Sequence, residues 1–161
     1  MQDEKKPETG AGSREIFIGA AIQSGNYKYK VVKIERNGNG QVCLIGAKKA
    51  LVTVKVPESI KLDGKTFQVT EIGDNAFKNQ KKLKKVIIGE NVQKIGAKAF
   101  YGCRKLTSIT IKSKKLHKMG KKAFQGISPK AVIRVPKKKY KKYRKLLKGK
   151  GIKSTMKIKK K

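Results

Sequence analysis

The stretch KIGAKAFYGC at residues 94–103 decides the fold, because close copies of it occur twice more in the chain. EIGDNAFKNQ occupies residues 71–80, and KMGKKAFQGI occupies residues 118–127. The starting positions 71, 94 and 118 are nearly evenly spaced, with a period in the low twenties. Such a period is typical of a solenoid whose coils stack on one another. The sequence therefore predicts one repeat domain in which neighbouring coils share a hydrophobic core.

A second apolar pattern lies between the copies. LKKVII begins at Leu83 and LTSITI at Leu106, which repeats the offset between the first two copies of the phrase. AVIRVP at residues 131–136 is a degenerate third version, and LVTVKVP at residues 51–57 is an earlier one. Alternation of apolar and polar residues predicts a short strand with one buried face. The core repeats are therefore expected to cover residues from about 52 to 136.

Each repeated phrase is expected to form a short helix. Ile95, Ala99 and Cys103 are spaced by four residues, with Phe100 beside them, and this spacing places them on one side of a helix or helical turn. Gly96 is expected where the chain changes direction. The predicted fold class is therefore α/β, with short strands and short helices in each coil of a solenoid. The side chains expected to form the repeat core are Ile72, Phe77, Leu83, Val86, Ile88, Ile95, Phe100, Cys103, Leu106, Ile109, Ile111 and Phe124.

Other segments are expected to cover the two ends of the solenoid. Residues 27–46 predict two strands joined at Asn37–Gly40, because repeated Asn-Gly between β-rich runs is typical of a hairpin. At the other end, Pro136 precedes a basic helix in which Tyr140, Tyr143 and Leu147 form one apolar stripe. Residues 152–158 are expected to add a last edge strand. Residues 1–24 are expected to be a disordered or linker lead-in, and residues 25–161 a single domain.

The units LKKVIIGENVQKIGAKAFYGC and LTSITIKSKKLHKMGKKAFQGI resemble the BspA-like class of leucine-rich repeats. The resemblance covers about Val54 to Pro136, and the hairpin and basic helix are similar to the end modules of such proteins. It implies a leucine-rich-repeat solenoid in a bacterial surface protein with a role in adhesion, host contact or envelope association. It implies no particular ligand. Gln80 and Ile127 replace the family's Cys in two of the three copies, which favours a packing role for Cys103.

The chain shows no constellation of residues for catalysis or metal binding. His117 is the only histidine and is expected in an exposed loop. Cys43 and Cys103 share no metal-like spacing with it, and a structural zinc site needs four ligands. No phosphate-binding loop is present. We therefore expect a non-enzymatic protein without a cofactor or metal.

The charge of the chain is the main indication of function. The formal net charge is +33, and the last acidic residue is Glu90. Residues 91–161 contain 26 lysines and arginines and no aspartate or glutamate. A surface that serves only solubility normally mixes both signs, so we expect an anionic partner such as a wall polymer, a glycosaminoglycan or a mucin glycan. The expected binding ridge consists of Lys112, Lys114, Lys115, Arg134, Lys137, Lys138, Lys139, Lys141, Lys142, Arg144 and Lys145.

Three other interpretations of the surface stay open. The lysines could simply be solvated. Nonspecific nucleic-acid binding through phosphates is possible, although 38 lysines against 5 arginines do not favour base reading, and no exposed aromatic platform is evident. A scaffold for a host or surface protein would use the strand face, with Ile87 and Thr110 pointing outward.

The location is implied by the resemblance alone. The sequence shows neither the basic start of an export signal nor the roughly 20 apolar residues of a membrane helix. We expect an extracellular or cell-surface monomer that does not insert into a membrane.

Overall fold

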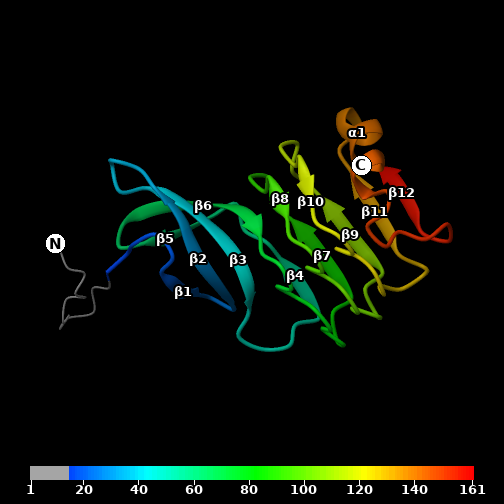
Figure 1. Cartoon of the computed structure of the whole chain (residues 1–161), viewed down its shortest axis with the longest axis horizontal. Coiled ribbons are helices and arrows are strands. Elements are labelled where there is room, and N and C mark those ends of the chain that lie inside the picture. The colour runs from blue at the N-terminus through cyan, green and yellow to red at the C-terminus, as the bar shows by residue number, and fades with distance from the viewer. Residues whose placement is uncertain (1–14) are drawn as a thin grey trace.

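The computed structural model describes residues 15–161. It shows an elongated stack of coils whose strands form two sheets, and the stack runs from the N-terminal to the C-terminal strands (Figure 1). The strands are β1 (Ala21–Ser24), β2 (Tyr27–Ile34), β3 (Gly40–Ala47), β4 (Thr53–Lys55), β5 (Ser59–Leu62), β6 (Lys65–Ile72), β7 (Lys85–Ile88), β8 (Lys94–Ile95), β9 (Ser108–Ile111), β10 (Lys118–Met119), β11 (Val132–Val135) and β12 (Lys157–Lys160). The helical elements in this part of the chain are a 3-10 turn, η1 (Lys137–Lys139), and one α-helix, α1 (Tyr140–Leu147).

One sheet, called sheet B here, consists of the strands predicted from the alternating pattern. Its order is β4-β7-β9-β11-β12, and all its strand pairs are parallel. Val54, Val86, Ile109 and Ile133 lie in register and are buried, so one row of the sheet faces the core. The last strand begins at Lys157, later than the expected segment 152–158.

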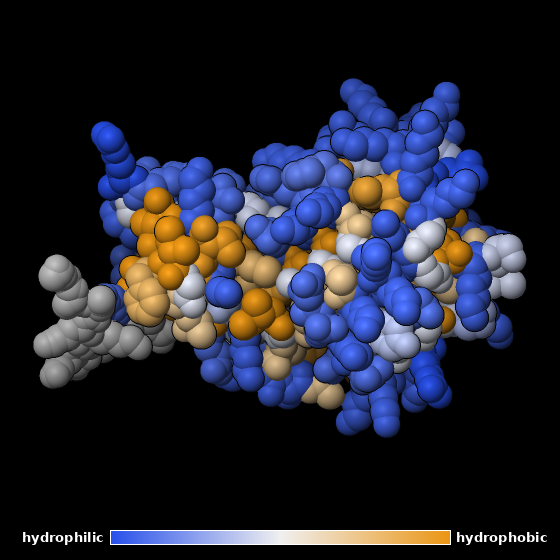
Figure 2. All heavy atoms as spheres, in the orientation of Figure 1, coloured by the Kyte–Doolittle hydropathy of each residue, from blue (hydrophilic) through white to orange (hydrophobic). Residues whose placement is uncertain are grey.

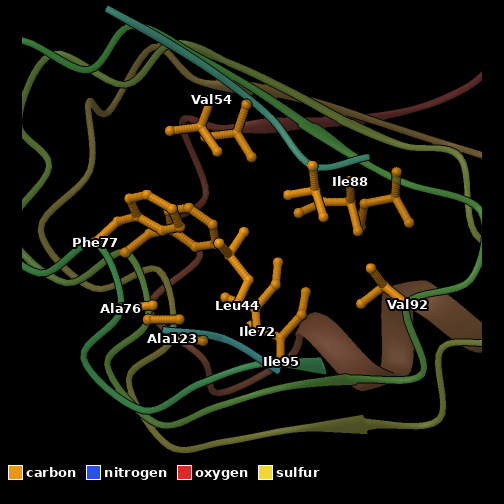
Figure 3. Packing of buried hydrophobic residues seen from close by; sticks show 14 of the residues in the cluster. Leu44, Val54, Ile72, Ala76, Phe77, Ile88, Val92, Ile95 and Ala123 are labelled. Carbon is orange, nitrogen blue, oxygen red and sulfur yellow. The ribbon is translucent and has the colours of Figure 1, made fainter. Parts of the chain in front are cut away.

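The opposite sheet, sheet A, has the order β1-β2-β3-β6-β8-β10, with β5 paired to β6. Strands β8 and β10 contain only two residues each, yet they keep Ile72, Ile95 and Met119 in register along the stack. Figure 3 shows Leu44, Ile72 and Ile95 of sheet A pointing into the same interior as Val54 and Ile88 of sheet B. The core therefore lies between the two sheets.

The repeated phrases stack as expected. The rings of Phe77 and Phe100 are parallel to within 7°, with centroids 5.5 Å apart, and Phe100 and Phe124 are parallel to within 2° at 5.3 Å. The ring of Tyr27 meets Phe77 edge-on, 6.5 Å away, at the N-terminal end of this column. Each of the twelve expected core side chains is exposed by 1% or less.

The prediction of a short helix in each coil was wrong. Residues 97–102 form turns, because alternate backbone N–H groups bond across coils and not within a helix. The N–H of Phe77 donates to the carbonyl oxygen of Ala99 at 2.8 Å, and the N–H of Phe100 donates to that of Ala123 at 2.8 Å. Lys98 has a left-handed φ of 56°, which ends any helical run. The coils consist of strands and turns, so the α/β class does not describe them.

Gly96 is needed for a different reason from the expected change of direction. A Cβ at this position would lie 2.5 Å from the backbone nitrogen of Asp74 and 2.6 Å from the carbonyl carbon of Gly73 in the preceding coil. The Asp74 side chain also accepts a hydrogen bond from the N–H of Ala97 at 2.8 Å. The glycine therefore permits close approach of two backbones.

The N-terminal hairpin has the predicted strands. Strand β2 pairs antiparallel with β3, and β3 pairs parallel with β6 of the first coil. Strand β1 pairs with β2, so residues 21–24 of the expected lead-in belong to sheet A. Residues 15–20 of that expectation precede β1, and there the N–H of Gly19 donates to the carbonyl oxygen of Val31 at 2.8 Å and Ala20 is buried. Residues 1–14 lie outside the described residues. The role of the hairpin as a cap stays a prediction.

The basic helix follows Pro136 and η1. Tyr143 and Leu147 of α1 are fully buried, and Tyr140 and Leu146 pack against the core while partly exposed. Gly149 follows the helix with a left-handed φ of 78°. The expected apolar stripe therefore attaches α1 to the C-terminal coils.

Candidate interaction surface

The parallel strands of sheet B end at one edge, and the charge of that edge changes along the stack. Glu58 and Glu90 follow the first two strands, β4 and β7. Lys112 and Lys137 follow β9 and β11, and Lys161 follows β12. In the orientation of Figure 2, hydrophilic side chains cover the part of the molecule around α1 and β12. The edge is therefore acidic in the early coils and basic in the late ones.

A buried tyrosine joins the loop after β9 to α1. The Tyr143 hydroxyl donates to the carbonyl oxygen of Ser113 at 2.7 Å and accepts from the N–H of Leu116 at 3.1 Å. The Ser113 hydroxyl, itself buried, donates to the carbonyl oxygen of Val92 at 2.5 Å. The neighbouring lysines stay exposed, with Lys115 Nζ 3.1 Å from Asn91 Oδ1. The structure thus brings Lys112, Lys114 and Lys115 beside the cations of α1.

The cations of α1 surround a hollow between the helix and β12. Its volume is about 570 Å³, with Ile152 and Ile158 among the residues that line it. Three of the expected ridge residues line it, namely Lys141, Arg144 and Lys145. Lys148 and Lys153 also line it, and the sequence reasoning missed both. The sequence does contain a signal for these two lysines, because both follow the apolar stripe of the predicted helix in a segment without acidic residues.

The remaining ridge residues are placed differently. Lys142 is exposed on α1 but does not line the hollow, and Lys137, Lys138 and Lys139 form η1, which leads directly into α1. Arg134 is half-buried on the outer face of sheet B, in register with Thr110 on one side and Lys159 on the other. The expected single ridge is therefore an edge plus a helix, with Arg134 apart from them on the strand face.

Acidic partners for these cations are absent from residues 15–161. The one ion pair in this part of the chain joins Lys94 Nζ to Glu71 Oε1 at 3.8 Å. Both side chains are partly exposed, so the pair contributes little to stability. One ridge cation instead contacts an aromatic ring: Arg144 lies 5.7 Å from the centroid of Tyr140, and Lys160 Nζ of β12 lies 5.2 Å from the same centroid.

Half-exposed aromatics were also missed from the sequence. Tyr101 has the ammonium groups of Lys78 and Lys98 each 5.7 Å from its ring centroid. Its outward position follows from its place next to the buried Phe100 in the repeated phrase. The sequence showed no exposed aromatic platform, and the half-exposed rings of Tyr101 and Tyr140 already have cationic partners.

The outer face of sheet B has its own ordered row. Lys55, Ile87, Thr110, Arg134 and Lys159 lie in register across the five strands. Ile87 and Thr110 at the centre are half-buried. A partner protein would meet a narrow, mixed apolar and polar surface here.

The cysteines belong to the core. The Cys103 thiol is fully buried and donates a hydrogen bond to the carbonyl oxygen of Phe77 at 3.0 Å. Burial raises the pKa of Cys103 to about 11, and burial together with the nearby Glu71 raises the pKa of Cys43 to about 11. Both thiols are free and protonated at neutral pH. This environment gives a packing role and no nucleophile.

The described part of the chain has its single histidine at the surface and holds no cluster of metal ligands. His117 is exposed, with its Nδ1 3.3 Å from the carbonyl oxygen of Lys115. Within residues 15–161, no three histidine, cysteine, aspartate or glutamate side chains gather closely enough to hold a metal ion. None of the helices in that range combines the length and apolar character needed to span a bilayer.

Three solved structures share this architecture. A leucine-rich repeat protein of Bacteroides capillosus is 19% identical, with a TM-score of 0.60, over 88% of this chain and 98% of its own. A leucine-rich cell surface protein of Faecalibacterium prausnitzii is 23% identical, with a TM-score of 0.57, over 75% of this chain and 34% of its own. A leucine-rich repeat protein of Bacteroides ovatus is 20% identical, with a TM-score of 0.53, over 73% of this chain and 38% of its own.

The chain therefore spans about a third of the length of two of these proteins and nearly all of the third. At these identities the similarity establishes the fold. No curated protein matches the sequence. The family model of the BspA type leucine rich repeat region matches residues 49–158 in 6 copies, beyond both ends of the resemblance seen at residues 54–136. The chain belongs to the BspA-type leucine-rich-repeat family.

Proposed function

We propose that the protein is a non-enzymatic cell-surface module that binds anionic polymers. The proposed binding surface is α1 together with the basic part of the sheet B edge, where β9 and β11 end. The observation that carries the proposal is the basic surface from Lys112 to Lys145, which has no acidic side chain paired to it in the described residues. Like charges held close together repel one another, and an anionic polymer would relieve that repulsion. The surface location is supported by the family and by the Faecalibacterium neighbour, which is a leucine-rich cell surface protein.

A polymer suits this surface better than a small anion. The cations are exposed lysines on long side chains, so each contact contributes little by itself. Many such contacts along one chain add through effective concentration. Wall polymers, glycosaminoglycans and mucin glycans present repeated negative charges along one chain. The module is proposed to act as a monomer outside the cell.

The test is binding to heparin and to an anionic wall polymer over a series of salt concentrations. We expect affinity to fall steeply as salt rises, because the contacts lie at the surface and are screened. The variant Lys141→Gln/Lys142→Gln/Lys145→Gln should lose about tenfold in affinity and show a shallower salt dependence. A salt-independent affinity would eliminate the proposal.

The control variant is Lys28→Gln/Lys30→Gln/Lys61→Gln, which removes the same charge from exposed positions on β2 and β5. It should bind nearly as well as the unmodified protein. An equal loss in both variants would mean that net charge, and no particular surface, governs binding. Duplex DNA of equal charge tests the nucleic-acid alternative, and tighter binding to DNA than to the glycans would favour it.

A protein partner on the strand face is the second candidate. Ile87 favours it, because this residue is apolar, half-buried and central in the outer row of sheet B. The variant Ile87→Asp should abolish binding to such a partner and leave binding of a short anionic oligosaccharide to α1 intact. Loss of that binding in this variant would place the oligosaccharide on the strand face.

A further inference from the structure

The edge at which the chain enters the strands of sheet B carries a second group of cations. Lys81 and Lys82 precede β7, and Arg104 and Lys105 occupy the equivalent positions one repeat later, before β9. All four side chains are exposed. Because the strands are parallel, this edge lies opposite the one that carries Lys112 and Lys137.

A hollow of about 520 Å³ lies among these residues. Lys81, Arg104 and Lys105 line it together with Asn79 and Gly102, and no acidic residue does. Gly102 leaves the hollow open, since a Cβ on it would collide with the Asn79 side-chain oxygen. The three cations therefore surround backbone and one amide side chain.

The frame of the hollow is held by hydrogen bonds between coils. The N–H of Asn79 donates to the carbonyl oxygen of Tyr101 at 2.7 Å, and the N–H of Gly102 donates to that of Gln125 at 2.8 Å. Both residues have left-handed backbones, with φ of 58° at Asn79 and 75° at Gly102. These bonds fix the turns and hence the positions from which the cations project.

The cations around this hollow, called the corner site here, are Lys81, Arg104 and Lys105. Lys81 and Arg104 occupy equivalent positions in neighbouring coils, so their charges repeat at the spacing of the coils. Neighbouring strands lie about 4.8 Å apart, so Lys81 and Arg104 start from backbones at about that separation. Like charges opposite each other on neighbouring strands are destabilising. Arg104 also supplies a planar fork of donors, which fits the paired oxygens of a carboxylate or sulfate.

We propose that Lys81, Arg104, Lys105 and the Asn79 amide form a second oxyanion site, which takes a carboxylate or sulfate group of an extended polymer. The choice of an anionic polymer as the ligand rests on the proposed function, whereas the oxyanion site rests on the residues that line the hollow. Strands β7 and β9 are four residues long and by themselves separate the two edges by roughly 13 Å, and Lys81 and Arg104 lie a few residues before the strands begin. A sufficiently long polymer crosses the strand face and engages both edges, with a gain from effective concentration.

The first test is a nuclear magnetic resonance titration with short sulfated or carboxylated disaccharides. We expect two separate groups of shifting signals, one from Asn79, Gly102 and the Arg104 side chain, the other from α1. The variant Lys81→Gln/Arg104→Gln/Lys105→Gln should lose the first group and keep the second. The disaccharide with sulfate alone and the one with carboxylate alone identify which group the corner takes.

The outcomes separate the two proposals. If only the α1 signals move, the corner site is wrong and the proposed function stands. If only the corner signals move, the ridge is wrong and the corner site stands. If neither group moves, both are wrong.

The second test uses long polymers and a substitution inside the hollow. Asn79→Asp places a carboxylate among the cations at a left-handed position that aspartate tolerates. We expect it to reduce affinity for long heparin about fivefold, whereas Asn79→Gly, which keeps the left-handed backbone and removes the amide donor without adding charge, should reduce it only about twofold. Equal affinities for the aspartate and glycine variants would overturn the corner site, and thermal unfolding of each variant checks that the fold is retained.

Discussion

The hydroxyl of Tyr143 lies 2.7 Å from the carbonyl oxygen of Ser113, and this bond joins the terminal helix to a loop that precedes it in the chain by more than one repeat. The same hydroxyl accepts the N–H of Leu116. Since Tyr143, Ser113 and Leu116 are all buried, water does not replace these bonds when they are broken. This one side chain therefore links the basic helix directly to the basic loop by hydrogen bonds, in addition to the apolar stripe that packs α1 on the core.

Tyr143→Phe should therefore destabilise the protein by about 1–3 kcal/mol, because it leaves a buried carbonyl and a buried N–H without partners. It removes no positive charge. We also expect weaker heparin binding, since α1 and the loop of residues 112–117 no longer hold a fixed arrangement. Chemical unfolding and a heparin titration measure the two effects.

Tyr140→Phe is the matched control. The Tyr140 hydroxyl donates to the carbonyl oxygen of Ile158 at 3.2 Å from a partly exposed position, where water can take over the bond. Its loss should cost less than about 1 kcal/mol. Equal effects of the two substitutions on stability and binding would contradict a special role for Tyr143.

Phe100→Ala should destabilise the protein by about 3–5 kcal/mol. Phe100 has a parallel ring on each side, Phe77 in one neighbouring coil and Phe124 in the other, so its removal breaks two ring contacts and leaves a cavity. Denaturant unfolding measures the change. The exposed Thr107→Ala serves as the control. A loss for Phe100→Ala no larger than for this control would argue against the column as a stabilising element.

Gly96→Ala should cost about 1–3 kcal/mol, because its Cβ would meet the backbone of Asp74 and force two coils apart. Gly46→Ala is a suitable comparison, since the nearest atom to its added Cβ is the carbonyl oxygen of Ala76 at 3.4 Å. That substitution should be nearly neutral. If thermal unfolding shows the same loss for both, close approach of the coils is not what requires Gly96.

Stability should fall as the pH rises above about 9. The thiols of Cys43 and Cys103 have an ordinary pKa of 9.0 and a folded pKa of about 11. Between these values the folded protein keeps protons that the unfolded chain releases, so the free energy of unfolding decreases with rising pH and the contribution is lost by about pH 11. Denaturant unfolding between pH 8 and pH 10 measures this slope.

The variant Cys43→Ala/Cys103→Ala keeps every lysine and so isolates the thiol contribution. Its stability should depend less on pH than that of the unmodified protein. Identical slopes for the two proteins would show that the buried thiols do not contribute.

The sequence determined the stacking of this protein. A hydrophobic phrase written three times at a nearly constant interval cannot bury its apolar side chains within one coil, so Phe77, Phe100 and Phe124 had to form a column. The positions of β4, β7, β9 and β11 followed from alternation, and the basic helix followed from its apolar stripe, whereas β1, β5, β6, β8 and β10 were not predicted.

Only the tertiary structure decided how the phrase itself folds and where the charges gather. A spacing of four residues suits a helix, but the N–H of Phe100 donates to the next coil and not to its own turn, and no local pattern reports a partner in another coil. For the same reason, Lys81 and Arg104 line one hollow while Arg134 lies apart from α1. Charge is a property of each residue in the sequence, whereas its neighbours across the coils depend on the register of the stack.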